Sequence, residues 1–439
     1  MKLSILWLIP VLVMTWGSSK AQNAASYKIH RALVEKYLVK SKELYNFFHI
    51  DEKGIVTYAS LEDKRNNKPE CVIYWDEVKY FTNLLLHTER KIQLSYYLDK
   101  KATRFTEKQR SYLQNIAYTP TIPSVVPAPG KLLSGYRIAI DPGHIAGDME
   151  MAKTESRFIE LEAGHGRRIT FCEGDLTLTT AFLLKRKLEE HGAMVMMTRS
   201  SPNTTSSGKT YKQWLRDDLP AILLREEKAG RLTAEQRKAL LQTPQSCKIY
   251  TQYFLANDLL ERAHLINSFK PDITVVIHFN ADPEKKHLNQ PTKKNYSMVF
   301  IPGAFLKGEL NTPEGRLDFL RLLLLDNMNK SQKLSEMIQN EFVTRLKVPA
   351  IPPDNQLAYL KNYSTYVSRG VYARNLGLCR LINSPICYGE SMYQDNEKEM
   401  FLLGTNDLQN NKPSPRIVEV ADAYFAGIIK YFENLKQGK

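Results

Sequence analysis

The sequence has few cysteines and, after its first residues, no long apolar run. Five cysteines at wide spacing in 439 residues are too few and too scattered for a disulfide scaffold. Cys379 and Cys387 flank the turn-like LINSP and could pair across it. The sequence also lacks zinc-finger cysteine pairs and an aromatic RNA-binding motif, so we expect no nucleic-acid partner. No later segment has the about 20 apolar residues of a membrane-spanning helix, so we expect no integral membrane segment in the mature chain.

The first residues, MKLSILWLIPVLVMTWGSSKAQ, have the layout of a secretory signal peptide. Lys2 precedes an apolar run over residues 3–16, and small residues follow before Ala21. We therefore expect a signal peptide over residues 1–21 and, because no cysteine stands near the cleavage point, no lipid attachment. The mature protein is expected to be exported, to the periplasm or to the cell surface and extracellular space.

Acidic residues are fewer than basic ones, and the formal net charge is +14. Such a charge suits nucleic acid, an acidic membrane face or an anionic polymer, and export favours the polymer. A basic, solvated surface accounts for the charge equally well.

The length exceeds that of one average domain, and one segment separates two kinds of sequence. The proline-rich TPTIPSVVPAPG, residues 119–130, is typical of a stiff linker. Residues 22–118 have helical periodicity and one short strand, GIVTYA, which indicates a small helix-rich N-terminal domain. Residues 131–439 form the second expected domain.

In the second domain, short apolar runs alternate with helical stretches. The expected strands are YRIAID, AMVMMTR, ITVVIHF, YSMVFI and PICYGE. This alternation predicts an α/β fold, with a mainly parallel twisted sheet and helices on both faces.

Four polar residues fall where the carboxyl ends of these strands meet. His144 follows the first strand, His278 ends ITVVIHF, Glu390 ends PICYGE, and Glu173 precedes the helix that returns from the first strand. Sites of open α/β sheets form at this edge. Two imidazoles and a carboxylate are a sufficient set for catalytic zinc and leave a fourth position for water.

A family resemblance rests on four segments in sequence order: IAIDPGH, EGDLTLTTAFLLKRKLEEHGAMVMMTR, LLERAHLINSFKPDITVVIHFNA and PICYGES. They resemble the motifs of the zinc-dependent N-acetylmuramoyl-L-alanine amidases of bacterial cell-wall turnover, from about residue 136 onward. The resemblance implies that His144, Glu173 and His278 bind Zn²⁺ and that Glu390 is catalytic. It also implies a peptidoglycan substrate and, in some members, a protein activator.

The chain departs from the family pattern after His144. The family usually has two glycines there, whereas this chain has Ile145 and Ala146, followed by a long insertion before Glu173. The insertion supplies other possible ligands: Glu155, Glu160, Glu162, His165 and Cys172. Four further residues match motif positions and are expected to anchor strand ends and loops: Arg199, Arg262, Asn267 and Asn280.

The expected chemistry is hydrolysis of the amide bond between N-acetylmuramic acid and L-alanine. Two alternatives stay open: a zinc peptidase or other amide hydrolase on the same scaffold, and a wall-binding protein without catalysis. One more question concerns the leucine-rich helix expected after Thr312 and Pro313. In some members of the resembled family a helix in this part of the chain covers the zinc, but core packing is the more frequent role of such leucines.

Overall fold

The structure is a computed structural model that describes residues 25–116, 130–162, 168–244, 246–284 and 290–438. The expected signal peptide, most of the expected linker and His165 lie outside the described residues.

The chain divides into two compact units. The first comprises Met1–Thr119, Gly303–Met328 and Tyr363–Thr365, and the second comprises Pro120–Pro302, Asn329–Asn362 and Tyr366–Lys439. The division near residue 119 coincides with the start of the proline-rich segment. Gly303–Met328, however, belongs to the first unit, although the sequence analysis assigns it to the second domain.

The first unit combines a small antiparallel sheet with helices. Its strands, in the order β1-β2-β3, are β1 (Phe48–Ile50), β2 (Gly54–Thr57) and β3 (Cys71–Tyr74). Its α-helices include α2 (Leu61–Arg65), α3 (Val78–His87), α4 (Arg90–Lys100), α5 (Glu107–Gln114) and α13 (Pro313–Leu324). The helix-rich character expected for this region is confirmed.

The leucine-rich helix α13 is part of the core of the first unit. It begins as expected, with Thr312 as N-cap and Pro313 in its first turn, and every residue from Gly315 to Leu324 is buried. Its Phe319 ring lies 4.6 Å from that of Phe48. It packs against α3 and α4, and its Asp318 pairs with Arg90 of α4. Core packing, and not a lid, is the role that these contacts give to the leucines.

The second unit is built on a seven-stranded sheet with the order β10-β11-β9-β12-β8-β4-β7. Neighbours β7, β4, β8 and β12 are parallel, β9 and β11 are parallel to each other, and β9 is antiparallel to β12. The expected, mainly parallel sheet is confirmed. The strands are β4 (Arg137–Pro142), β7 (Met194–Met197), β8 (Ile273–Asn280), β9 (Met298–Pro302), β10 (Ser364–Ser368), β11 (Val371–Arg374) and β12 (Ile386–Tyr393).

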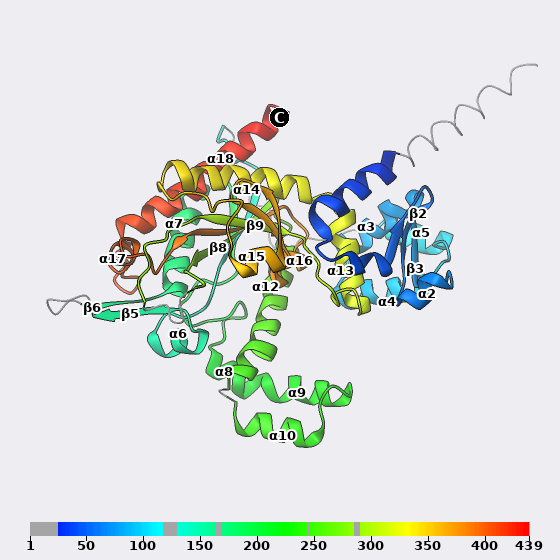
Figure 1. Cartoon of the computed structure of the whole chain (residues 1–439), viewed down its shortest axis with the longest axis horizontal. Helices are drawn as coiled ribbons and strands as arrows, with labels where there is room; N and C mark the ends of the chain where they lie inside the picture. The colour runs from blue at the N-terminus through cyan, green and yellow to red at the C-terminus, as the bar shows by residue number, and fades with distance from the viewer. Residues whose placement is uncertain (1–24, 117–129, 163–167, 245, 285–289, 439) are drawn as a thin grey trace, which may run out of the picture. The chain divides into compact units, whose positions relative to one another are not determined.

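Helices cover both faces of this sheet, as expected (Figure 1). On one face, Val276 of β8 packs with α12 (Leu255–Phe269) and α16 (Gly377–Leu381). On the other face, Gly389 of β12 contacts Tyr424 of α18 (Pro415–Lys436). Helix α18 also packs against α7 (Glu173–Glu190). Gly389 is the strand partner of Ile277, which follows Val276 on β8. Because successive residues of a strand point to opposite faces, α12 and α18 lie on opposite faces of the sheet.

Further helices complete the second unit. They are α6 (Met149–Glu155), α8 (Tyr211–Asp217), α9 (Leu219–Lys228), α10 (Ala234–Gln242), α11 (Cys247–Ile249), α14 (Met328–Thr344), α15 (Ala358–Tyr363) and α17 (Glu399–Leu403). Helices α8 to α10 form a projection, drawn in green in Figure 1, and Tyr211, Trp214 and Leu223 of these helices share a buried cluster with Phe254, which precedes α12. None of the described helices is long and apolar enough to cross a membrane.

The structure differs from the expected fold in three strand regions, the first of which is β1 and β3 beside the one strand expected in the first unit. Antiparallel strands β5 (Phe158–Glu162) and β6 (Arg168–Cys172) form a hairpin inside the insertion, and β10 and β11 extend the main sheet. These strands are short, and charged residues interrupt the apolar pattern of β5 and β6.

The suggested disulfide is not formed. Cys379 on α16 and Cys387 on β12 are free thiols with no exposure, and burial raises the pKa of each to about 12. Both thiols are packed as small apolar groups, on a helix and on a strand.

A substitution in α13 tests its role in the core. Leu320 has no exposed surface, so Leu320→Ala should lower the free energy of unfolding by about 2–5 kcal/mol through lost contacts and an unfilled cavity. Leu98→Ala is the matched control, because Leu98 of α4 is 40% exposed. Denaturant unfolding of both variants gives the comparison. A variant at Leu320 that keeps parental stability and gains activity would instead identify α13 as a lid.

Candidate metal centre

Three side chains from distant parts of the sequence converge at the edge of the main sheet. His144, Glu173 and His278 each offer one ligand atom, and these atoms lie within 4.8 Å of one another. The side chains are largely buried, with exposures of 20%, 2% and 12%. Among the described residues this is the group of histidine, cysteine and acidic residues with the spacing of a metal site.

His144 lies in a turn that follows β4 and has a left-handed backbone conformation, with φ of 55°. This conformation is uncommon outside glycine and costs free energy, so neighbouring groups must hold it. Arg199 donates to the carbonyl oxygens of Pro142 and Gly143, and Thr177 Oγ1 donates to the Gly143 oxygen over 2.6 Å. Arg199 and Thr177 therefore hold the part of the turn that precedes His144.

Glu155, from the insertion, holds the other side of the same turn. Its carboxylate accepts hydrogen bonds from the backbone N–H groups of Ile145 and Ala146, at 2.9 and 3.1 Å, and from the Tyr250 hydroxyl at 3.1 Å. Its Oε2 lies 3.7 Å from His144 Nδ1. Burial disfavours the ionised carboxylate, but His144 and the two backbone amides outweigh it and lower the pKa of Glu155.

His278 approaches the same turn so closely that only glycine fits opposite it. A Cβ atom on Gly143 would lie 2.2 Å from Cε1 and Nε2 of the His278 ring. The ring also stacks on Tyr388, with centroids 4.5 Å apart and an interplanar angle of 11°. Gly143 and Tyr388 thus confine the imidazole from different sides.

Glu173 opens α7, where the helix dipole favours a negative charge. Its Oε1 lies 3.0 Å from His278 Nδ1 and accepts from the Phe279 N–H, and its Oε2 accepts from Gln394 Nε2 over 2.9 Å. Burial opposes ionisation, but the two histidines and Arg157 outweigh it and lower the pKa of Glu173 to about 2. The carboxylate is therefore held ionised, as a metal ligand must be.

Glu390 lies on β12 directly beside His278 of β8. Burial and the negative charge of Glu173 raise the pKa of Glu390 to about 8, against the opposing effects of Arg374 and His144. Its Oε2 has no hydrogen-bond partner among the described residues. Glu390 is therefore beside the three-residue group and is not a member of it.

The other candidate ligands of the insertion are engaged elsewhere or lie outside the described residues. The Cys172 thiol donates to the Ala146 oxygen, and burial raises its pKa well above the usual value. Glu160 and Glu162 pair with Arg168 across the β5–β6 hairpin. His165 is not among the described residues. The Glu155 carboxylate accepts hydrogen bonds from the backbone after His144 and lies beside the His144 ring.

Arg262, Asn267 and Asn280 have contacts of the anchoring kind expected for them. Arg262 donates to Asp141, Asp258 and the Pro142 oxygen. Asn267 joins the Leu381 oxygen to the Asn383 N–H, and Asn280 Nδ2 lies 3.5 Å from Tyr359 Oη.

Two groups that support the centre were not found in the sequence, namely Gln394, which orients Glu173, and Glu155 in its contact with His144. Glu155 could be noticed in the sequence because it is an acidic residue of the insertion. Gln394 is neutral, and nothing in the sequence indicated its contact with Glu173.

The fold and the site define an α/β protein with a histidine, glutamate and histidine centre at the carboxyl edge of a mainly parallel sheet. The sequence profile of the N-acetylmuramoyl-L-alanine amidases matches residues 138–428, more than half of the chain. The chain belongs to this family, and the protein is an amidase. The family resemblance inferred from the sequence is therefore confirmed. No curated protein matches the chain.

The chain is also similar to solved amidase structures. The CwlD amidase from Clostridioides difficile, in complex with the GerS lipoprotein, is 18% identical with a TM-score of 0.35, covering 68% of this chain and 98% of that chain. Ami1 from Mycobacterium smegmatis is 16% identical with a TM-score of 0.36, covering 69% and 99%. AmiC2 of Nostoc punctiforme is 14% identical with a TM-score of 0.34, covering 68% and 99%. Membership of the family rests on the sequence profile.

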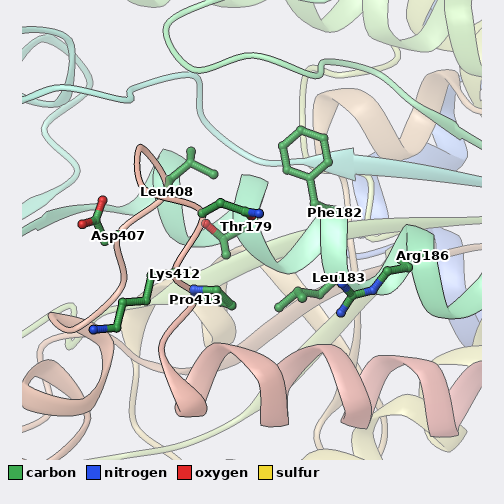
Figure 2. A pocket seen from close by; sticks show the side chains of 9 residues that line it. Thr179, Phe182, Leu183, Arg186, Asp407, Leu408, Lys412 and Pro413 are labelled. Carbon is green, nitrogen blue, oxygen red and sulfur yellow. The ribbon is translucent and has the colours of Figure 1, made fainter.

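A pocket of about 410 Å³ lies apart from this centre, between α7 and the segment 407–413 (Figure 2). Its lining includes Phe182, Leu183 and Arg186 of α7 together with Asp407 and Lys412. None of the four residues at the sheet edge lines it. Charges of both signs and apolar groups share its wall, and this mixture selects no ligand class.

The contact between Glu155 and the His144 turn can be tested by removing one charge. In Glu155→Gln an amide N–H₂ must replace one of the two oxygens that accept backbone N–H groups, so the turn loses a bond and His144 its anionic neighbour. We expect zinc affinity to fall by about 10- to 100-fold, as for other groups that orient metal ligands. Glu160→Gln is the control, because the Glu160 side chain pairs with Arg168 within the β5–β6 hairpin. Chelator competition that gives equal affinities for the parent and both variants would refute the positioning role.

Proposed function

We propose that this enzyme hydrolyses the amide bond between N-acetylmuramic acid and L-alanine in peptidoglycan, with Zn²⁺ held by His144, Glu173 and His278. The observation that carries the proposal is the convergence of these three ligand atoms beside Glu390, whose buried Oε2 has no hydrogen-bond partner among the described residues, in a chain of this amidase family. The proposed role is in cell-wall turnover or remodelling.

The three side chains fit zinc by number, type and spacing. Two imidazoles and one carboxylate form a set that leaves a coordination position for water, and their ligand atoms lie within 4.8 Å of one another. Zinc bound there would polarise the amide carbonyl and lower the pKa of its water toward about 7.

Glu390 is the proposed proton carrier. Hydrolysis of an amide needs a base that takes a proton from water and an acid that returns it to the departing nitrogen. A raised pKa makes both protonation states of the Glu390 carboxyl accessible near neutral pH. The pKa of Glu173 is lowered to about 2, so the ligand carboxylate does not compete for this proton near neutral pH.

Peptidoglycan lies outside the cytoplasm, and the proposed location of the mature protein is accordingly the periplasm or the cell surface. The N-terminal segment that suggested export lies outside the described residues. The protein activator implied by the resemblance stays a prediction. The other amide hydrolases on this scaffold would share the metal centre but release different products.

Substitution of the two histidines tests the metal assignment. His144→Ala and His278→Ala each remove one of three protein ligands, and we expect near-complete loss of tightly bound zinc from correctly folded protein. Metal analysis after dialysis measures it, with His264→Ala as the control because the structure places that residue on α12, outside the ligand group. Full zinc occupancy in both ligand variants would overturn the assignment.

Substitution of Glu390 separates chemistry from metal binding. Glu390→Gln keeps the size of the side chain but cannot accept a proton, so we expect turnover to fall by about 10²- to 10⁴-fold with zinc content unchanged. Muropeptide release, zinc content and thermal melting are measured on one preparation. Activity within about threefold of the parent would remove Glu390 from the mechanism, and loss of zinc would make it a ligand.

A further inference from the structure

Arg374, the last residue of β11, carries a positive charge that aromatic rings hold in place. Its Cζ lies 5.2 Å from the ring centroid of Phe300 and 5.2 Å from that of Tyr359. Within the described part of the chain its guanidinium has no hydrogen bond or ion pair, and the side chain is partly exposed. Aromatic faces orient a guanidinium but accept none of its in-plane N–H bonds, so these donors face water or a ligand.

The other arginines near the metal centre are used differently. Arg199 and Arg262 are buried and donate to several oxygens of the turn that precedes His144. Arg157 lies 3.8 Å from Glu173. Arg374 differs from these three arginines because its guanidinium N–H groups have no hydrogen-bond partner among the described residues.

A continuous row of rings leads from the metal centre to Arg374. His278 stacks on Tyr388 with centroids 4.5 Å apart, and Tyr388 meets Phe300 edge to face at 6.1 Å. Phe300 in turn lies under the guanidinium. Tyr388 and Phe300 are direct partners across β12 and β9, so their side chains share one face of the sheet.

Tyr359 connects the same two places by a second route. Its hydroxyl lies 3.2 Å from Met298 Sδ, and Met298 is the direct partner of Glu390 across the strands. Arg374 is thus linked, through Tyr359 and Met298, to the strand position of Glu390.

The geometry points to Arg374 as the binding residue for a free carboxylate on the peptide part of the substrate, beyond the cleaved bond. This inference rests on the function proposed above. A planar guanidinium matches a carboxylate with two parallel hydrogen bonds, whereas neutral sugar hydroxyls offer no such match.

The distance from the metal centre suits a peptide. The three steps from His278 through Tyr388 and Phe300 to the guanidinium measure 4.5, 6.1 and 5.2 Å, and the length of this path is the upper limit of the separation. An extended peptide advances about 3.3–3.6 Å per residue. A carboxylate on the second to fourth residue after the cleaved amide therefore reaches Arg374, while the amide itself lies at the metal centre.

Matched substrates test the inference. The substrates are muramoyl tripeptides with all peptide carboxylates free, with the second residue's carboxylate amidated, or with the C-terminal carboxylate amidated. We expect the parent to show a KM about tenfold higher for one of the amidated forms, as the loss of one charged hydrogen-bonded contact implies. In Arg374→Gln the same pair should differ by less than about twofold, and Arg374→Lys, which keeps the charge without the planar fork, should fall between.

Arg369→Gln is the control, because Arg369 is an exposed residue that precedes β11. It should keep the discrimination of the parent. A structural clamp would instead alter kcat or thermal melting equally for all three substrates and leave their ratios unchanged. That outcome, or a parent that does not distinguish free from amidated carboxylates, would overturn the inference.

Calorimetric binding of the same muramoyl peptides to Glu390→Gln separates this inference from the proposed reaction. We expect tighter binding of the free-carboxylate peptide, and loss of that preference in the double variant Glu390→Gln, Arg374→Gln. Failure of the parent to hydrolyse any muropeptide would contradict the proposed function, whereas equal binding of free and amidated peptides would contradict the role of Arg374.

Discussion

The ionised carboxylate of Glu173 is the interaction on which the rest of the site depends. It is almost fully buried, where a lone charge is costly, and it persists because it sits at the start of α7 among donors from two other segments. Those donors tie α7 to β8 and to the residues after β12. The charge that can bind a metal is therefore also the charge that joins these elements at the sheet edge.

The same charge sets the contrast between the two glutamates. Glu173 has cationic and hydrogen-bonding neighbours and is held ionised, whereas Glu390 is buried beside that negative charge and its pKa is raised. Pairs of carboxyl groups whose surroundings separate their pKa values commonly divide their roles. The division proposed here, one ligand and one proton carrier, follows from the surroundings and not from residue type.

Much of this arrangement follows from the sequence, because it depends on local patterns. Apolar runs that end close to His144, His278 and Glu390 mark strands whose carboxyl ends meet, and α7 is marked by its own periodicity. The features that could not be predicted from the sequence depend on contacts between distant segments. Gln394 is neutral and follows no motif, and the assignment of α13 to the first unit depends on its contacts with α3 and α4. The reversal of direction between β12 and β9 likewise leaves no mark in strand periodicity.

The central claim is that this centre cleaves one particular amide bond, and the products of digestion test it most directly. Purified peptidoglycan is digested with the zinc-loaded enzyme, and the soluble products are identified by mass spectrometry and N-terminal analysis. The account predicts stem peptides with a new N-terminal alanine, glycan chains whose lactyl carboxylates are free, and loss of both products after chelation. New N-termini at other residues, with the lactyl–alanine bond intact, would contradict it.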